Sequence, residues 1–225
     1  MNGIHDVGGM DNIGPLVIED KEPVFHADWE RQVFSMNIAM IVAGYFEIDE
    51  VRRVTELMPA VDYLGADYYE KWLYSFEELL VEKNALTRAE IAAGKSLGEN
   101  DTILPAASKA NVEGAMTNPL SVRKVADTAS KFNVGDRVLT KNMNPVHHTR
   151  IPRYVRGKRG VIEQCHGAFL LPDTNAYGGT EIVQHNYTVK FSAQEIWGDD
   201  STGNDFFYID LFDDYMDEDT QITGT

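Results

Sequence analysis

Cysteine is nearly absent from this chain of 225 residues, in which Cys165 is the only one. A lone thiol cannot form an intramolecular disulfide, nor can it build a cysteine-ligated metal cluster without ligands from elsewhere. Long apolar runs are also missing, since no stretch approaches the roughly 20 residues that a membrane-spanning helix needs. Residues 1–14 lack the basic and apolar segments of a signal peptide. We therefore expect a cytoplasmic protein with no membrane partner.

Basic residues are scarce as well: 20 Lys and Arg stand against 36 Asp and Glu, giving a formal net charge of −16. This balance argues against a general affinity for nucleic acid, because phosphate binding needs a broad positive field. The exception is the stretch HHTRIPRYVRGKRGVIE, residues 147–163. Its basic residues are Arg150, Arg153, Arg156, Lys158 and Arg159. The run could be a solvated loop, the turn of an RNA-binding SH3-like barrel, or a set of arginines buried at a partner interface.

The first part of the chain has the spacing of helices. Residues 1–25 are rich in Gly and Pro, which break regular elements, yet they keep apolar side chains, so we expect an extended arm laid over another surface. Residues 26–95 place apolar side chains at helical intervals and form a predicted helical domain. The predicted helices cover 28–43, 49–58, 67–83 and 87–94, with Asn84 ending the third and a capping box at Thr87 opening the last.

The later part of the chain has the alternation of strands. Residues 96–130 lose periodicity and are a predicted linker between two domains. From 131 to 225, short alternating runs between Gly, Pro and Asp turns predict a β-barrel or roll. The predicted strands lie in FNVGDRVLT, RYVRGKRGVIEQC, NYTVKFSAQEIW and FFYIDLFDDYM, the second as two pieces around a turn at Gly157–Gly160. The fold class is α+β: an N-terminal extended arm and helical domain, then a C-terminal SH3-like β-barrel or roll.

No metal site is evident in the sequence. The six histidines do not fall at HExxH or HxH spacing. Only Cys165 and His166 place two soft ligands together, and a zinc site needs three or four. We predict that this chain alone binds no metal, and that Cys165 is a small buried residue of a strand.

Two clusters on the predicted helices are candidates for function. The stretch YYEKWLYSF, residues 68–76, is crowded with aromatic side chains. Its spacing is typical of a helix-packing core, but Tyr68 and Tyr74 fall off the main stripe and could line a pocket for a small organic molecule. In the preceding helix, Arg53 and Glu56 are spaced i,i+3 and form a predicted ion pair. Arg52 has no equally obvious partner there.

A series of sequence blocks carries a resemblance to a known family. In order along the chain, they are MNGIHDVGGMD, EPVFHADWE, EIDEVRR, DYYEKWL, FNVGDRV, HTRIPRYVRGKRGVI, HGAFLLPDT, YTVKFSAQEIWG and IDLFDDYM. Together these blocks resemble the β subunit of nitrile hydratase. The resemblance spans nearly the whole chain apart from 96–130. In that family the enzyme adds water to a nitrile to give an amide. A non-haem Fe(III) or non-corrin Co(III) ion is held by a cysteine-rich loop of the α subunit, in which two cysteines are oxidised to sulfenic and sulfinic forms. The resemblance therefore implies no cofactor in this chain, an α-subunit partner in an αβ or α2β2 assembly, and a small nitrile substrate.

The resemblance also implies roles for two arginines. In the family, two β-subunit arginines hydrogen-bond the oxygens of the oxidised cysteines. Arg52 matches one of them in the block DEVRR, and Arg150 matches the other in HTRIPRY. A buried oxyanion needs a fixed donor, and a guanidinium group is always charged. One departure lies close by, because His147 stands where Gly is common.

The substrate pocket carries over in part. Tyr68 and Trp72 match aromatic wall positions of the family, and Ile48 matches an apolar one. Asn37 stands where the family usually has an apolar wall residue. The resemblance therefore allows a more polar or differently shaped nitrile than a purely hydrocarbon one.

Two alternatives stay open at the level of sequence. One is a subunit of a thiocyanate-hydrolase-like relative, whose subunits divide the same architecture differently. The other is a non-enzymatic protein, either an RNA-binding SH3-like module or a helper protein. A helical half and a strand-rich half in a single chain favour nitrile hydratase over the first. Salt-dependent binding to generic RNA would favour the second.

Overall fold

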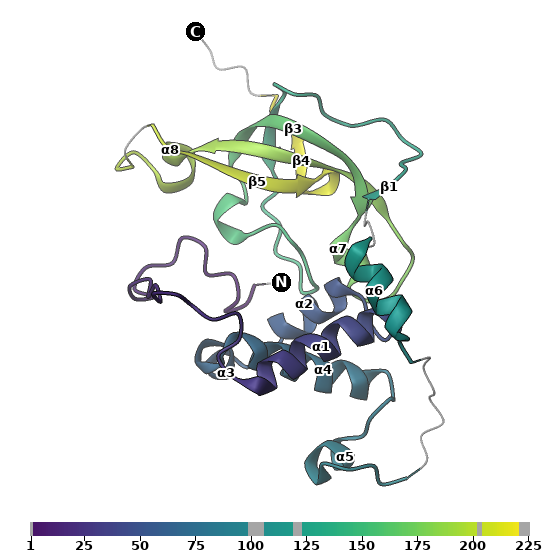
Figure 1. Cartoon of the computed structure of the whole chain (residues 1–225). Coiled ribbons are helices and arrows are strands. Elements are labelled where there is room, and N and C mark those ends of the chain that lie inside the picture. Colours follow the sequence, from purple (N-terminus) through teal and green to yellow (C-terminus); the bar gives the residue numbers. More distant parts are fainter. Residues whose placement is uncertain (1, 99–105, 119–122, 202–203, 221–225) are drawn as a thin grey trace. The chain divides into compact units, whose positions relative to one another are not determined.

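A computed structural model describes residues 2–98, 106–118, 123–201 and 204–220 (Figure 1). The chain divides into two compact units. The helical unit comprises Gly3–Leu120 together with the short segment Ala176–Gly178. The sheet unit comprises Met1–Asn2, Ser121–Asn175 and Gly179–Thr225. None of the helices in the described ranges combines the length and hydrophobicity needed to cross a membrane.

The helical unit is built around α4, which packs against both α1 and α2. Its helices are α1 (Asp28–Val42), α2 (Ile48–Glu56), α3 (Ala60–Gly65), α4 (Tyr68–Glu82), α5 (Arg88–Ala93) and α6 (Lys109–Thr117). Its core consists of Val33, Phe46, Val51, Val54, Phe76 and Leu79. The four predicted helices are confirmed as α1, α2, α4 and α5. Asn84 has the left-handed φ of 57° that ends α4, and the Thr87 hydroxyl accepts from the Glu90 N–H at 3.2 Å.

Two helices of this unit were not predicted, α3 and α6. The helix α6 lies inside the segment predicted as a linker and contacts α1. Its sequence KANVEGAMT contains a glycine and no clear apolar stripe, so periodicity could not reveal it. A local signal does exist, because the Ser108 hydroxyl accepts from the Asn111 N–H at 3.1 Å and caps the helix.

The arm that precedes α1 has no helix or strand in residues 2–25. Several of its apolar side chains are exposed within the chain alone. They are Met10, Ile13, Leu16, Val17, Ile18 and Val24. Exposed apolar side chains grouped in this way are typical of a segment that contacts another surface.

The sheet unit is one six-stranded sheet in the order β5-β4-β3-β2-β6, with β1 paired to β3. Its strands are β1 (Arg123–Lys124), β2 (Arg137–Thr140), β3 (Arg159–Leu170), β4 (Val183–Ser192), β5 (Phe206–Phe212) and β6 (Met216–Glu218), and all pairs are antiparallel. Its short helices are η1 (Arg153–Val155), α7 (Pro172–Asn175), α8 (Ala193–Trp197) and η2 (Asp213–Tyr215). The α+β class is confirmed. The sheet is open among the described residues, so closure into an SH3-like barrel stays a prediction.

Three expectations for this unit are corrected by the structure. Arg153–Val155 is a 3-10 helix and not the first of two strand pieces, because Pro152 starts a turn there. The residues AQEIW form α8, since the Ser192 hydroxyl accepts from the Glu195 N–H and opens a helix where the alternation suggested more strand. Cys165 lies in β3 as predicted but is exposed, not buried.

Candidate functional site

The helix α2 carries two of the predicted site residues, Ile48 and Arg52. They are spaced i,i+4, so they lie on the same face of the helix. The Arg52 Nη1 donates to the Oδ1 of Asp49 at 3.0 Å. The Asp49 side chain is buried, whereas the Arg52 side chain is 48% exposed. A buried carboxylate therefore holds one edge of the guanidinium while the rest of the group reaches the surface of the helical unit.

Arg53 has an opposite environment, although it is the next residue. It is buried, its Nε donates to the Ala176 carbonyl at 2.8 Å, and its Nη2 donates to both carboxylate oxygens of Glu82 at 3.0 and 2.9 Å. The guanidinium also lies 5.0 Å from the ring centre of Tyr177. The predicted local pair of Arg53 with Glu56 is therefore wrong, because the side chain points into the unit and not along the helix surface.

The first turn of α4 forms an aromatic corner. The ring centres of Tyr68 and Trp72 lie 5.3 Å apart, and Tyr69 lies within 5.4 Å of both. Trp72 stacks on Phe34 of α1, and Tyr69 contacts Phe25 of the arm. Tyr68 is 63% exposed, whereas Tyr69 and Trp72 are partly buried against the core. The three rings together form an aromatic surface. Tyr68 is the most exposed of them, and its hydroxyl is a polar group at the edge of that surface.

Asn37 lies in the middle of α1 and is 4% exposed. Its Oδ1 has no hydrogen-bond partner among the described residues. Leaving a buried acceptor unpaired costs about 1–3 kcal/mol. Within the described residues, Asn37 therefore keeps an unused hydrogen-bond acceptor inside the helical unit.

Arg150 lies between β2 and η1 and is flanked on both sides by buried residues. His148, Thr149 and Ile151 have exposed fractions of 6% or less, whereas the Arg150 side chain is exposed. The Arg150 backbone N–H donates to the Tyr215 hydroxyl at 3.1 Å. The backbone is thus anchored in the sheet unit while the guanidinium extends from it.

The remaining basic residues of this segment do not act as one set. Arg156 is buried and donates through Nε and Nη2 to the Ile151 carbonyl, at 3.2 and 2.9 Å. Its Nη1 donates to the Asn144 side chain at 3.2 Å. Arg159 instead pairs with Asp219, with 3.4 Å between its Nε and the carboxylate. The basic residues that lie close together in the sequence therefore differ in role: Arg156 binds the main chain of its own segment, and Arg159 pairs with a buried carboxylate.

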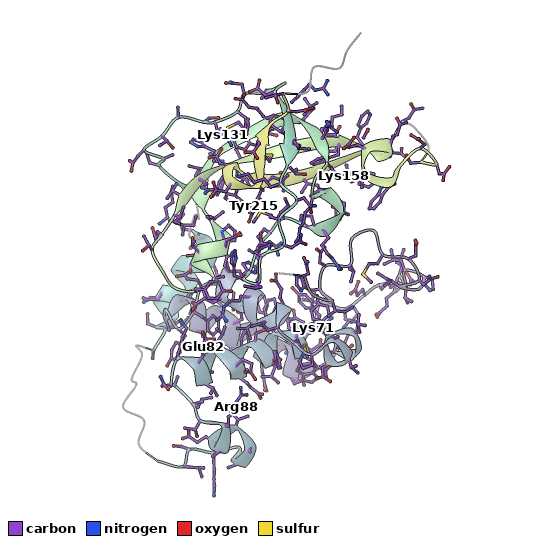
Figure 2. All side chains as sticks on the ribbon, turned by 180° about the vertical axis from the view of Figure 1, so that it is seen from behind. Lys71, Glu82, Arg88, Lys131, Lys158 and Tyr215 are labelled. Carbon is purple, nitrogen blue, oxygen red and sulfur yellow. The ribbon has the colours of Figure 1, made fainter. Side chains whose placement is uncertain are left out.

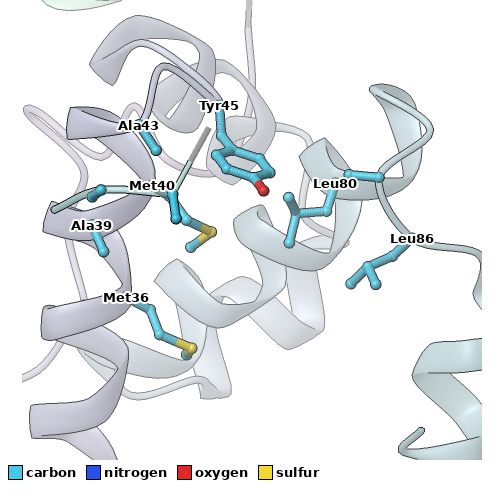
Figure 3. Close-up of a pocket in the computed structure, with 10 residues that line it drawn as sticks. Met36, Ala39, Met40, Ala43, Tyr45, Leu80 and Leu86 are labelled. Carbon is cyan, nitrogen blue, oxygen red and sulfur yellow. The ribbon is translucent and has the colours of Figure 1, made fainter. Parts of the chain in front are cut away.

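The helical unit also contains an open cavity of about 370 Å³ between α1 and the end of α4 (Figure 3). The lining residues are Met36, Ala39, Met40, Ala43, Tyr45, Leu80, Ala85, Leu86, Ala106 and Ala107. The Tyr45 hydroxyl is the only side-chain polar group among them. None of the predicted pocket-wall residues lines this cavity, so it is separate from the aromatic corner of α4.

The described residues contain no group of three or more His, Cys, Asp or Glu side chains that could hold a metal ion. The predicted residues also do not come together in one unit. Asn37, Ile48, Arg52, Tyr68 and Trp72 belong to the helical unit, and Arg150 belongs to the sheet unit. The contacts that orient Arg52 therefore come from the helical unit, and those that hold the Arg150 main chain come from the sheet unit.

Sequence reasoning missed three residues that surround these arginines. Asp49 could have been found by the same i,i+3 rule that was applied to Arg53. Tyr215 and Asp173 could not, because 42 positions separate them and the fold alone brings them together. The Tyr215 hydroxyl donates to the Asp173 Oδ1, and burial together with this carboxylate raises the pKa of Tyr215 far above its usual range.

Comparison with known proteins covers nearly the whole chain. The profile for the N-terminal part of the nitrile hydratase β subunit matches residues 1–118, and that for the C-terminal part matches residues 121–218. The chain is 43% identical to the nitrile hydratase β subunit of Pseudomonas putida, over 96% of this chain and 99% of the relative. It is 38% identical to the β subunit of the low-molecular-weight cobalt-containing nitrile hydratase of Rhodococcus rhodochrous, over 96% and 99%.

A thiocyanate hydrolase resembles only part of the chain. The α subunit of the enzyme from Thiobacillus thioparus is 31% identical over 40% of this chain and 72% of the relative. The similarity to nitrile hydratase β subunits is therefore both closer and more extensive.

Proposed function

Because this chain belongs to the nitrile hydratase β-subunit family, we propose that it assembles with a metal-bearing α subunit into a complex that hydrates nitriles to amides. A Co(III) or Fe(III) ion in the partner would supply Lewis-acid activation. The relative named as a cobalt-containing nitrile hydratase supports a metal in the assembled complex. The proposal extends to an αβ or α2β2 assembly in the cytoplasm.

We propose that Arg52 and Arg150 direct their guanidinium groups at the oxygens of oxidised cysteine ligands in the α subunit. Support for Arg52 comes from the buried Asp49 carboxylate, which orients the group while half of the side chain stays exposed. Support for Arg150 comes from its exposed position between the buried residues Thr149 and Ile151. A guanidinium fork offers two parallel donors at fixed charge, which suits sulfur oxyanions.

Tyr68, Trp72, Ile48 and Asn37 are proposed to form part of the substrate wall. The aromatic contact between Tyr68 and Trp72 supplies a flat apolar surface with one exposed hydroxyl. Asn37 supplies a buried acceptor without a partner in the described chain. Small-molecule sites typically combine apolar walls with a few such polar groups. We propose a nitrile substrate that carries a hydrogen-bond donor in addition to the nitrile group.

The sheet unit is proposed to be an SH3-like roll. Two register shifts in the pairing of β3 with β4, between Ile162 and Gln164 and between Cys165 and Gly167, support this idea. Such bulges bend a strand and increase its twist, which is how small sheets curl towards closure.

The test of the arginine roles is Arg52→Lys and, separately, Arg150→Lys in the complex coexpressed with its α subunit. Lysine keeps the positive charge but lacks the planar fork. We expect turnover of a nitrile to fall by about 10²-fold or more, as when a single donor to a negative oxygen is lost. Turnover and metal content per complex are measured together.

The matched control is Arg153→Lys, an exposed arginine in the same segment that has no proposed role at the metal. This variant should retain wild-type turnover. If Arg52→Lys and Arg150→Lys kept both turnover and metal content, the arginine roles would be wrong. If the wild-type complex hydrated no nitrile, the proposed activity itself would be wrong.

A further inference from the structure

The position of Arg150 is determined by its main chain more than by its own side chain. Its neighbours Thr149 and Ile151 are buried, so the segment cannot shift outward without exposing them. Three hydrogen bonds hold the main chain here, one at Arg150 and two at Ile151. The Tyr215 hydroxyl accepts from the Arg150 N–H, and the Arg156 guanidinium donates to the Ile151 carbonyl.

Tyr215 joins three segments of the sheet unit through one oxygen atom. The side chain is 1% exposed and belongs to η2 near the C-terminal end (Figure 2). Its hydroxyl donates to the Asp173 carboxylate of α7 and accepts from the Arg150 backbone. The two bonds are complementary, because the hydroxyl must point its proton at Asp173 to leave a lone pair for Arg150.

The charge on Asp173 strengthens this arrangement. A hydrogen bond to an ionised acceptor is shorter and stronger than one between neutral groups. Burial and the nearby carboxylate both favour the neutral phenol, so the proton stays on Tyr215 at any physiological pH. The direction of the hydroxyl is therefore fixed, and with it the acceptor that faces the Arg150 N–H.

We propose that Tyr215, oriented by Asp173, is a positioning residue for Arg150, and that its hydroxyl sets the main chain from which the Arg150 guanidinium extends towards the partner's anionic ligands. This inference rests on the role proposed for Arg150. Displacement of a functional group by about 1 Å can cost up to about 10²-fold in rate, so a hydrogen bond that fixes the main chain affects catalysis without touching a reactant.

The test is Tyr215→Phe in the coexpressed complex, because phenylalanine keeps the ring and removes the hydroxyl. We expect kcat to fall by about tenfold with KM within about twofold and with normal metal content, as for a misplaced catalytic group. Amide hydrogen exchange should become at least about tenfold faster at Arg150, because its N–H loses its acceptor, while the strands β3 and β4 keep their protection. Wild-type exchange at Arg150 together with wild-type kcat would overturn the inference.

Two further variants sharpen this test. Tyr208→Phe removes the hydroxyl of an exposed tyrosine in β5 of the same unit and should change neither kcat nor exchange at Arg150. Asp173→Asn keeps an oxygen acceptor but removes its charge, so it should produce a smaller change in the same direction as Tyr215→Phe. If Tyr215→Phe fails to fold, Asp173→Asn carries the test, and wild-type kcat and exchange in this variant would overturn the inference.

Combining Tyr215→Phe with Arg150→Lys separates this inference from the proposed function. If Tyr215 acts through Arg150, the double variant should be no slower than Arg150→Lys alone, because the effects of coupled residues do not add. Additive effects would overturn the inference and leave the role of Arg150 intact. A wild-type rate in Arg150→Lys would overturn the role of Arg150 and the inference with it.

Discussion

A single buried phenol illustrates how this chain uses individual residues. The Tyr215 hydroxyl accepts a hydrogen bond from the Arg150 N–H, and its surroundings favour the neutral phenol. Burial penalises the phenolate, and the Asp173 carboxylate repels it. Because burial and the Asp173 carboxylate raise the pKa of Tyr215 in the folded chain, the stability of the fold depends on pH.

We predict that Tyr215 makes the protein less stable in alkaline solution. Its folded-state pKa is raised above the ordinary value of 10.0, so the folded chain keeps a proton that the unfolded chain releases above that pH. The stabilising effect is complete below pH 10.0 and is lost as the pH rises beyond it. Denaturant unfolding between about pH 9 and about pH 11 should show a steeper loss for wild type than for Tyr215→Phe. Equal slopes would contradict the prediction.

Residue environments were the hardest feature to predict from the sequence. The ordered blocks along the chain predicted the family, which the comparisons confirm, whereas the roles of Arg52 and Arg150 stay predictions. Spacing alone assigned the local ion pair to Arg53, whereas the structure gives it to Arg52 and Asp49. Helical spacing says which side chains are neighbours on a helix, but the choice of the buried face depends on α4 and on the segment at Ala176.

At the scale of elements, β3 and β4 form the longest pairing of the sheet unit, and Gly160 of β3 lies next to its first pair. A β-carbon at Gly160 would lie 2.5 Å from the Val189 Cγ1 and 3.0 Å from the Phe191 ring. Both neighbours are core residues with no exposed surface. The close approach of these strands therefore depends on the missing side chain at residue 160.

We predict that Gly160→Ala lowers the free energy of unfolding by about 1–3 kcal/mol, because the core around Val189 must move to admit a methyl group. Gly179→Ala is the control, since nothing lies within 4 Å of a β-carbon there and its φ is not left-handed. That variant should change the free energy by less than about 0.5 kcal/mol. Denaturant titration of both variants measures the difference, and similar midpoints would refute the prediction.

Element types were predictable where the periodic pattern was long. The helices α1 and α4 each span 15 residues, and both were found close to their observed bounds. The short elements were missed or misassigned: η1 and α8 have three and five residues, less than two turns each, so they display no period. The sequence marks these elements only by single capping or turn residues, such as Ser192 and Pro152. The alternating polar and apolar pattern around them suggests a strand more strongly than one such residue suggests a helix.

At the scale of the whole molecule, the arm of residues 2–25 exposes a run of three consecutive apolar side chains. Leu16, Val17 and Ile18 are each more than 80% exposed. Burying an apolar side chain of this size contributes about 1.5–3 kcal/mol. We expect that contribution to come from the α subunit.

We predict that replacing Leu16, Val17 and Ile18 together by serine weakens association with the α subunit by at least about tenfold. The unfolding free energy of the isolated chain should stay within about 0.5 kcal/mol of wild type, because these side chains make few contacts there. Val146→Ser, at another exposed valine, is the control. Calorimetric titration of the two subunits gives the affinity, and an unchanged Kd would show that the arm does not bind the partner.

The helical unit is discontinuous in sequence, and this affects how the chain is made. Its last piece, Ala176–Gly178, is encoded more than fifty positions after the rest. Domains commonly begin to fold as the nascent polypeptide leaves the ribosome. The Arg53 guanidinium cannot meet its carbonyl acceptor at Ala176 until all of β3 has also been translated. The helical unit therefore cannot complete its fold until Ala176–Gly178 has been translated. A gene divided before residue 176 would produce a helical fragment in which the Arg53 guanidinium lacks its carbonyl acceptor.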